Sequence, residues 1–141
     1  MAIKQLSVFV ENKQGSLHEI TDALAKANIN LRSMSVADTS NYGIVRIIAD
    51  DPDKAKALLD GEGHAANVRL VNAFAVPDQP GGLAAVLNLL EGNGVNIEYM
   101  YALITTEEGK AYSVMRTGNT EETDKILSEN GIELLNGEKL K

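Results

Sequence analysis

Residues 12–17 read NKQGSL and residues 78–83 read DQPGGL, two versions of one short motif placed 66 residues apart. The same offset relates Ile29-Asn30-Leu31 to Val95-Asn96-Ile97, which follow the two motifs at equal distances. A match that recurs at one spacing indicates an internal repeat. The chain of 141 residues therefore contains the same structural unit twice.

The repeat continues toward the end of the chain with a small change in spacing. Leu58-Leu59 matches Ile126-Leu127 at an offset of 68, so the second copy has two extra residues in a hairpin turn. No Gly/Ser-rich or Pro-rich linker separates the copies. We place the two domains at 1–70 and 71–141 and expect them to be joined directly.

Hydrophobic spacing predicts the same order of elements in both copies. In the first copy, alternation predicts strands, and apolar residues at helical spacing predict helices. The expected strands of this copy are 3–10, 29–38, 42–49 and a stretch from about 67, and the helices run from Ser16 (itself or its neighbour the N-cap) to Asn28 and from Pro52 to Gly61–Gly63. The second copy is expected to have strands at 71–76, 95–106, 109–117 and 132–135, a helix that faces the core with Leu83, Val86, Leu87 and Leu90, and a helix near 120–130.

The order strand–helix–strand–strand–helix–strand is that of the ferredoxin-like fold. We therefore predict an α+β protein made of two ferredoxin-like βαββαβ repeats, whose antiparallel sheets carry helices on one face. The stretch 95–106 is apolar on both sides of a strand, with Ile97, Tyr99 and Tyr101 on one side and Met100 on the other. The second face of that sheet is therefore expected to be covered, by the other repeat or by another subunit.

The two glycine-containing turns are the best candidates for a binding site. A glycine before a helix lets the backbone approach a ligand closely, and the free N–H groups of the first helical turn attract anions. Asn12 and Asp78 precede these turns and can hold a polar group of the ligand. Such a pocket suits a zwitterion. Ordinary turn chemistry explains either segment alone, and repeat ancestry explains why it occurs twice.

Both copies resemble the ACT domain, the small amino-acid-sensing module of metabolic enzymes. The second copy carries the resemblance in residues 78–83 and in Gly94-Val95-Asn96-Ile97, and the first copy is a looser version of the same pattern. The resemblance covers essentially the whole chain as two ACT-like repeats. It implies a regulatory, non-catalytic binding protein whose sheets pair side by side and hold a free amino acid at their interface.

The resemblance also implies which residues contact the ligand. They follow the first strand, begin the first helix and begin the second strand of each repeat: Asn12, Gly15, Ser16, Leu17, Asn30 and Leu31, and Asp78, Gly81, Gly82, Leu83, Asn96 and Ile97. The first repeat departs from the pattern, with Asn12 for the acidic residue and Gln14 for the proline. We therefore expect the two sites to differ in affinity, or one of them to be vestigial.

The family usually joins this module to a catalytic domain, and these 141 residues contain none. Regulation is therefore expected to act in trans on a metabolic enzyme, from a protein that is itself a homodimer. An assembly module that binds such an enzyme and has vestigial pockets is the alternative. An acylphosphatase-like hydrolase is disfavoured, because the loops after the first strands carry no Arg.

Composition excludes several other classes of function. The 13 Lys and Arg against 20 Asp and Glu give a net charge of −7 without a basic stripe, which disfavours nucleic acid and anionic membranes as partners. The chain has no cysteine, and its two histidines, His18 and His64, lack metal-ligand spacing, so we expect no metal and no cofactor. Both histidines are predicted to be exposed. No signal peptide or membrane span is apparent, and a cytoplasmic protein is expected.

Overall fold

A computed structural model describes residues 2–38, 40–104 and 107–140. Its contacts divide the chain into two compact units. Lys4–Arg69 form one, called the N-terminal unit below, and Met1–Ile3 with Leu70–Lys141 form the other, called the C-terminal unit. No helix of the described residues has the length and apolar character needed to cross a membrane.

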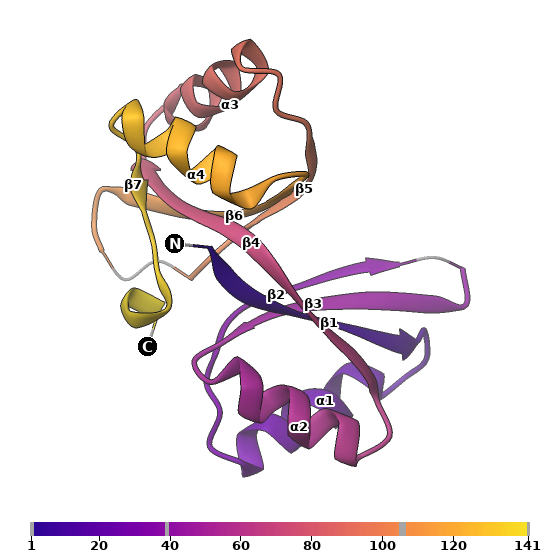
Figure 1. Ribbon diagram of the computed structural model, residues 1–141. Helices are drawn as coiled ribbons and strands as arrows, with labels where there is room; N and C mark the ends of the chain where they lie inside the picture. Colours follow the sequence, from indigo (N-terminus) through magenta and orange to yellow (C-terminus); the bar gives the residue numbers. More distant parts are fainter. Residues whose placement is uncertain (1, 39, 105–106, 141) are drawn as a thin grey trace. The chain divides into compact units, whose positions relative to one another are not determined.

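The N-terminal unit is a sheet covered on one face by two helices (Figure 1). Its elements are β1 (Ile3–Glu11), α1 (Ser16–Lys26), β2 (Leu31–Asp38), β3 (Tyr42–Ala49), α2 (Pro52–Gly61) and the first residues of β4 (Ala65–Pro77). β1 and β2 both pair with β3 in antiparallel register, so the strand order is β2-β3-β1. The core lies between this sheet and the helices, where Leu6, Val8 and Ile47 are fully buried together with Ile20 and Leu24 of α1.

Helix α1 shows why these elements form where they do. Ile20 and Leu24, which the apolar spacing places on one face, are buried together with Ala23. The helix ends where Asn28 takes a left-handed conformation, with φ of 58°. One expectation is confirmed and one is wrong. The N-cap is Gly15, the neighbour of Ser16. Leu17, expected on the apolar face of the helix, is 37% exposed because it lies in the first turn, beyond the buried face.

The C-terminal unit repeats this arrangement (Figure 1). It contains the rest of β4, α3 (Gly82–Gly92), β5 (Ile97–Ala102), β6 (Lys110–Thr117), α4 (Thr120–Glu129), β7 (Glu133–Leu134) and a short 3-10 helix (Gly137–Leu140). β4 pairs with β6 and β7, and β5 pairs with β6, all antiparallel. Phe74, Val86, Leu90, Met115 and Leu127 are buried in its core. Leu83, which was expected to face that core, is 39% exposed at the start of α3.

Strand β5 differs from the expected regular alternation. The register with β6 shifts between Ile97 and Tyr99, which is a bulge. As a result Ile97 and Met100, expected on opposite sides, both pack against the helix-covered core. Tyr99 and Tyr101 stack on each other, with ring centroids 6.5 Å apart. Residues 105–106, predicted as the end of this strand, lie outside the described residues.

The two units correspond element by element, which confirms the predicted pair of βαββαβ repeats. The start of α3 follows that of α1 by 66 residues, and the start of α4 follows that of α2 by 68. Even the bulge recurs, because the register of β2 shifts between Leu31 and Ser33. The segments from about 67 and at 71–76, predicted as two strands, form one strand of 13 residues, β4. The boundary placed between 1–70 and 71–141 thus falls inside this strand and stays a prediction.

Candidate functional site

The turns before α1 and α3 have the same backbone structure in both units. In the first, the Asn12 N–H donates to the Asn41 carbonyl, and the Ser16 N–H donates to the Lys13 carbonyl. In the second, the Asp78 N–H donates to the Gly109 carbonyl, and the Gly82 N–H donates to the Gln79 carbonyl. The sequence motif therefore corresponds to one defined loop geometry.

Glycine is needed where each of these loops enters its helix. Gly15 and Gly81 are the N-caps, with φ of 87° and 86°, a left-handed conformation that favours glycine. Neither provides a side chain to cap the helix. Helices α2 and α4, in contrast, are capped by Asp51 and Asn119, whose side chains accept hydrogen bonds from backbone N–H groups. The first turns of α1 and α3 are therefore open to an anionic ligand group.

The predicted contact residues of one unit do not meet in one place. Asn12, Gly15, Ser16 and Leu17 lie at the N-terminal end of α1, whereas Asn30 and Leu31 lie beyond its C-terminal end. An 11-residue helix separates these groups by about 16 Å, at 1.5 Å per residue.

In the second repeat, α3 separates Asp78, Gly81, Gly82 and Leu83 from Asn96 and Ile97 in the same way.

Asn30 is held in place by two hydrogen bonds to Asp50. The Asn30 N–H donates to the Asp50 carboxylate at 3.1 Å, and the Asp50 N–H donates to the Asn30 carbonyl at 3.0 Å. Within the described residues, the side chains of Asn12 and Asp78 form no hydrogen bond and are available to a ligand.

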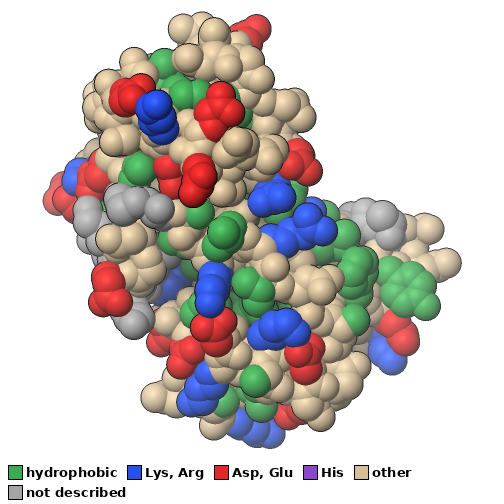
Figure 2. Space-filling model, in the orientation of Figure 1, with side chains coloured by type: hydrophobic (Ala, Val, Ile, Leu, Met, Phe, Trp, Pro, Cys, Tyr) green, Lys and Arg blue, Asp and Glu red, His purple; other side chains and the backbone are tan. Residues whose placement is uncertain are grey.

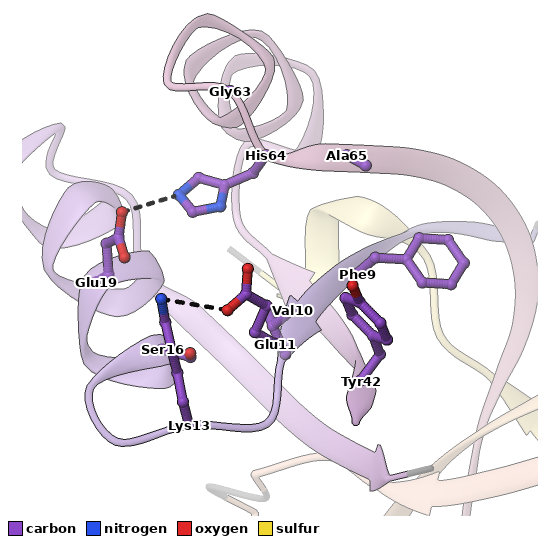
Figure 3. A pocket seen from close by; sticks show the side chains of 10 residues that line it. All are labelled: Phe9, Val10, Glu11, Lys13, Ser16, Glu19, Tyr42, Gly63, His64 and Ala65. Carbon is purple, nitrogen blue, oxygen red and sulfur yellow. Dashed lines mark ion pairs between the residues drawn. The ribbon is translucent and has the colours of Figure 1, made fainter. Parts of the chain in front are cut away.

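A cavity of about 290 Å³ opens at the end of β1 in the N-terminal unit (Figure 3). It lies between the first turn of α1, the start of β3 and the connection from α2 to β4. Its lining consists of Phe9, Val10, Glu11, Lys13, Ser16, Glu19, Tyr42, Gly63, His64 and Ala65. Its volume is close to the lower end of the range for small-molecule sites, which suits a single small metabolite. Of the twelve predicted contact residues, Ser16 lines it.

The charged groups of this cavity lie in two pairs. Lys13 Nζ is 3.3 Å from Glu11 Oε2, and His64 Nε2 is 3.8 Å from Glu19 Oε1. Figure 3 shows the imidazole pointing from the α2–β4 connection toward α1. The prediction that His64 faces solvent is wrong, because its side chain is only 16% exposed. Its Nε2 atom is buried without a hydrogen-bond partner among the described residues. His18 is exposed, as predicted.

Two aromatic side chains line the cavity on the other side of the end of β1 from Glu19 and His64 (Figure 3). Phe9 and Tyr42 are 49% and 57% exposed, which is high for residues of their size. Tyr42 on β3 lies opposite Glu11 on β1, so both project from the same face of the sheet. Sequence reasoning missed the contribution of the α2–β4 connection. The repeat offset could have indicated it. That offset aligns His64 with Ile132, an apolar residue that packs against the core of the C-terminal unit, so His64 is at a position that faces inward.

A second cavity, of about 340 Å³, lies in the C-terminal unit. It is lined by Asn93, Gly94, Val95, Asn96, Glu98, Gly118, Asn119, Glu122 and Thr123. Asn96, one of the predicted contact residues, is therefore at a cavity, but at the end of α3 remote from Asp78. Among the described residues, no cluster of three His, Asp or Glu side chains suits a metal ion.

Charge is mixed on the face of the molecule drawn in Figure 2. On the face drawn in Figure 2, Lys and Arg side chains lie among Asp and Glu side chains over the N-terminal unit. A continuous basic stripe of the kind that binds phosphate backbones is not formed on this face.

Comparison with known proteins gives a family and several structural relatives. A family model described as an ACT domain pair matches residues 1–141. A crystal structure of a protein from Bacteroides thetaiotaomicron is 41% identical, with a TM-score of 0.93 over 99% of this chain and 96% of that one. A comparison with curated proteins finds no match.

Two further crystal structures share the fold. The regulatory subunit of aspartate kinase from Thermus thermophilus, in its ligand-free form, is 16% identical, with a TM-score of 0.67 over 91% of this chain and 92% of that one. The corresponding subunit from Thermus flavus is also 16% identical, with a TM-score of 0.62 over 89% and 90%. At this identity the likeness concerns the fold alone.

Proposed function

Because this chain belongs to the ACT domain pair family, we propose that it is a non-catalytic regulatory protein that binds a free amino acid. One observation carries the proposal. Two helices, α1 and α3, begin without a side-chain cap after the same left-handed glycine, whereas the other two α-helices are capped. Keeping a helix N-terminus open is useful where an anionic group binds.

The ligand is held by both of its charged groups. Its carboxylate accepts from the N–H groups of the first helical turn, near Ser16 in one repeat and Gly82 in the other. Its ammonium group is met by carbonyl oxygens and by the side-chain oxygen of Asn12 or Asp78. A zwitterion satisfies both ends of this arrangement, whereas a simple anion satisfies only one.

The remaining predicted contacts support a homodimer. Because Asn30 and Leu31 lie about one helix length from Ser16, they contribute to a site only beside another ACT sheet. A second copy of the chain, paired side by side, supplies Asn30 and Leu31 or Asn96 and Ile97 to such a site. Sedimentation velocity of the purified protein tests the dimer directly.

We infer that regulation acts in trans on an enzyme of amino-acid metabolism. The two Thermus proteins with this fold are named as regulatory subunits of aspartate kinase, which supports a role as a separate regulatory chain. The amino acid can regulate a partner only if it binds two arrangements of the protein with different affinity. Couplings of this kind are typically about 1–3 kcal/mol.

Thermal unfolding in the presence of each common amino acid tests the proposed function. Binding to the native state stabilises it by about 2.7 kcal/mol at a hundredfold excess over Kd, which raises Tm by several degrees. We expect a shift with one or a few related amino acids. If none of them shifts Tm at millimolar concentration, the sensor is wrong and an assembly module with vestigial pockets takes its place.

A further inference from the structure

The C-terminal end of the first helix is treated differently in the two repeats. In the N-terminal unit, the Lys54 ammonium of α2 donates to the carbonyl of Ala27, the C-cap of α1, at 2.9 Å. Lys54 lies in the first turn of α2, where a cation is unfavourable for its own helix, but it meets the negative end of α1. This place in the fold therefore holds an ammonium group in the first repeat.

The second repeat lacks that ammonium. The offset of 66 aligns Ala27 with Asn93, the C-cap of α3, and the offset of 68 aligns Lys54 with Glu122 in the first turn of α4. α3 lies against α4 as α1 lies against α2 (Figure 1). The last turn of α3 has no basic residue, whereas that of α1 contains Lys26. The negative end of α3 therefore receives no cation from either helix.

The cavity of about 340 Å³ in the C-terminal unit lies at this place, because Asn93 and Glu122 both line it. A second replacement makes room for it. Asp50, whose carboxylate accepts a backbone hydrogen bond at 3.1 Å, is aligned with Gly118, which has no side chain and also lines the cavity. The side chains of Asp50 and Lys54 thus occupy, in the first repeat, the place that is open in the second.

The charges of the cavity favour a cation. Its lining contains two carboxylates, those of Glu98 and Glu122. Glu98 Oε2 lies 3.8 Å from Arg116 Nε, which balances its charge. The side chain of Glu122, in contrast, forms no hydrogen bond or ion pair within the described residues. A cation at the end of α3 is therefore attracted by the Glu122 carboxylate and by the partial negative charge of the helix terminus.

An anion is disfavoured in the same cavity, because it would lie beside the unpaired Glu122 carboxylate. The N-terminus of α4 is already capped by Asn119, whose side chain accepts from the Glu122 N–H at 3.0 Å. Among cations, a primary ammonium suits the site best. It has three N–H donors, enough for the Asn93 carbonyl and the Glu122 carboxylate together.

We propose that the cavity between the end of α3 and the start of α4 binds the primary ammonium group of a small amine, which takes the place that Lys54 occupies in the first repeat. The volume of the cavity is within the range of small-molecule sites. It lies at the opposite end of α3 from Asp78 and Gly82, so this site is additional to the proposed amino-acid site and does not depend on it.

Titration of the isotope-labelled full chain with n-butylammonium, followed by the NMR signals of its backbone amides, tests the proposal. This probe reproduces the side chain of lysine without its backbone. We expect saturable shifts of the amides of residues 93–96 and 118–123. Butyrate, which carries the opposite charge on a chain of the same length, is expected to leave these signals unchanged.

Glu122→Lys introduces the residue that the first repeat has at this position. Its own ammonium then occupies the site, so we expect n-butylammonium to bind at least about tenfold more weakly. Glu121→Lys is the matched control, because it makes the same charge change at a neighbouring position that does not line the cavity. At an ionic strength of about 0.15 M, where charges more than about 8 Å apart are screened, it should keep the wild-type Kd within about twofold.

Lys54→Ala provides the reciprocal test. The substitution removes the ammonium from the Ala27 carbonyl, so n-butylammonium should now shift the amides of residues 27–30, which it leaves unchanged in the wild type. Lys54 is exposed, so its loss leaves folding intact, and circular dichroism verifies this. Lys56→Ala removes a lysine of the same helix that pairs with Asp60, and it should not produce these shifts.

Several results would overturn the inference. They are equal binding in wild type and Glu122→Lys, shifts caused by butyrate, no saturable shift in the wild type, and no shift at residues 27–30 in Lys54→Ala. None of them bears on an amino acid at the first turns of α1 and α3, which thermal unfolding tests separately.

Discussion

Gly82 is the residue at which the second motif allows least change. A Cβ atom built there would lie 2.3 Å from the Pro77 carbonyl oxygen, closer than real Cβ atoms approach. We predict that Gly82→Ala forces the loop away from α3 and lowers the free energy of unfolding by about 1–3 kcal/mol. Urea denaturation followed by circular dichroism measures this change.

Gly92→Ala, at the other end of α3, is the matched control. No atom lies within 4 Å of the Cβ it would add. Because alanine favours helix more than glycine does, we expect this variant to be unchanged or more stable by up to about 1 kcal/mol. Equal stability of the two variants would mean that the loop relaxes without cost around residue 82.

The sequence predicted the glycines that precede α1 and α3 better than it predicted which side chains are exposed. Gly15 and Gly81 are recognisable because the same motif places a glycine before each helix, and both are left-handed in the structure. Leu17 and Leu83 continue the apolar spacing, yet they project beyond the buried face because they lie in the first turn. His64 was missed because the position of a turn residue depends on the helix that packs opposite it.

At the level of elements, β4, β6 and α4 of the C-terminal unit bury polar side chains between them. Asn72, Thr117, Thr123 and Asp124 form a buried network, in which Asn72 Nδ2 donates to Asp124 Oδ1 at 2.7 Å and Thr117 Oγ1 donates to Asn72 Oδ1 at 2.9 Å. Leu6 occupies the position of Asn72 in the N-terminal unit. The C-terminal unit therefore buries a polar network at a position where the N-terminal unit buries Leu6.

We predict that Asn72→Leu destabilises the protein although it copies Leu6. The substitution removes the amide that pairs with Asp124 and Thr117, and each unsatisfied buried group costs about 1–3 kcal/mol. Urea unfolding measures the loss.

The control for this variant removes the whole network. Asn72→Leu, Thr117→Ala, Thr123→Ala and Asp124→Ala together replace its polar side chains with apolar ones, and we expect the fourfold variant to be more stable than Asn72→Leu alone. If Asn72→Leu is as stable as the wild type, the network contributes nothing to folding.

The hairpin of β5 and β6 contains a charge cluster that makes stability depend on pH. The hydrogen bond from Tyr112, and after it that from Lys110, lowers the pKa of Glu107 below its usual 4.5. A carboxyl group with a lowered pKa stabilises the fold above its unfolded pKa, and this contribution is lost as pH falls through the folded pKa. The pKa of Lys110 is raised by Glu133 and then Glu107, so its contribution disappears only at strongly alkaline pH.

We therefore predict that Glu107→Gln lowers Tm at pH 7 and that the difference from wild type shrinks as pH falls below about 4.5. The substitution removes the charge but keeps the shape of the side chain. Differential scanning fluorimetry across a pH series measures both curves. Glu108→Gln changes the adjacent exposed carboxylate and is expected to track the wild type at every pH. A pH-independent difference for Glu107→Gln would exclude its charge as the cause.

At the scale of the whole molecule, the repeat was visible in the sequence and the continuity of β4 was not. The offsets of 66 and 68 relate the starts of α1, β2, β3 and α2 to those of α3, β5, β6 and α4. In a strand that contributes residues to two units, the amino-acid pattern does not mark where the first unit ends. Residues 65–77 therefore looked like two strands, with the boundary between 70 and 71, whereas the backbone passes through without a turn.

The continuous strand leads to a prediction about cooperativity. Because β4 contributes to both units, we expect the chain to unfold in one transition and not in two. Leu24 and Leu90 are equivalent core residues on α1 and α3, each fully buried. Truncating either to alanine costs about 2–5 kcal/mol, and each kcal/mol lowers Tm by about 2–4 °C in a protein of this size. In differential scanning calorimetry, Leu24→Ala and Leu90→Ala should each shift the same single peak, with equal calorimetric and van't Hoff enthalpies. Two peaks, one sensitive to each substitution, would show that the units unfold separately although they share a strand.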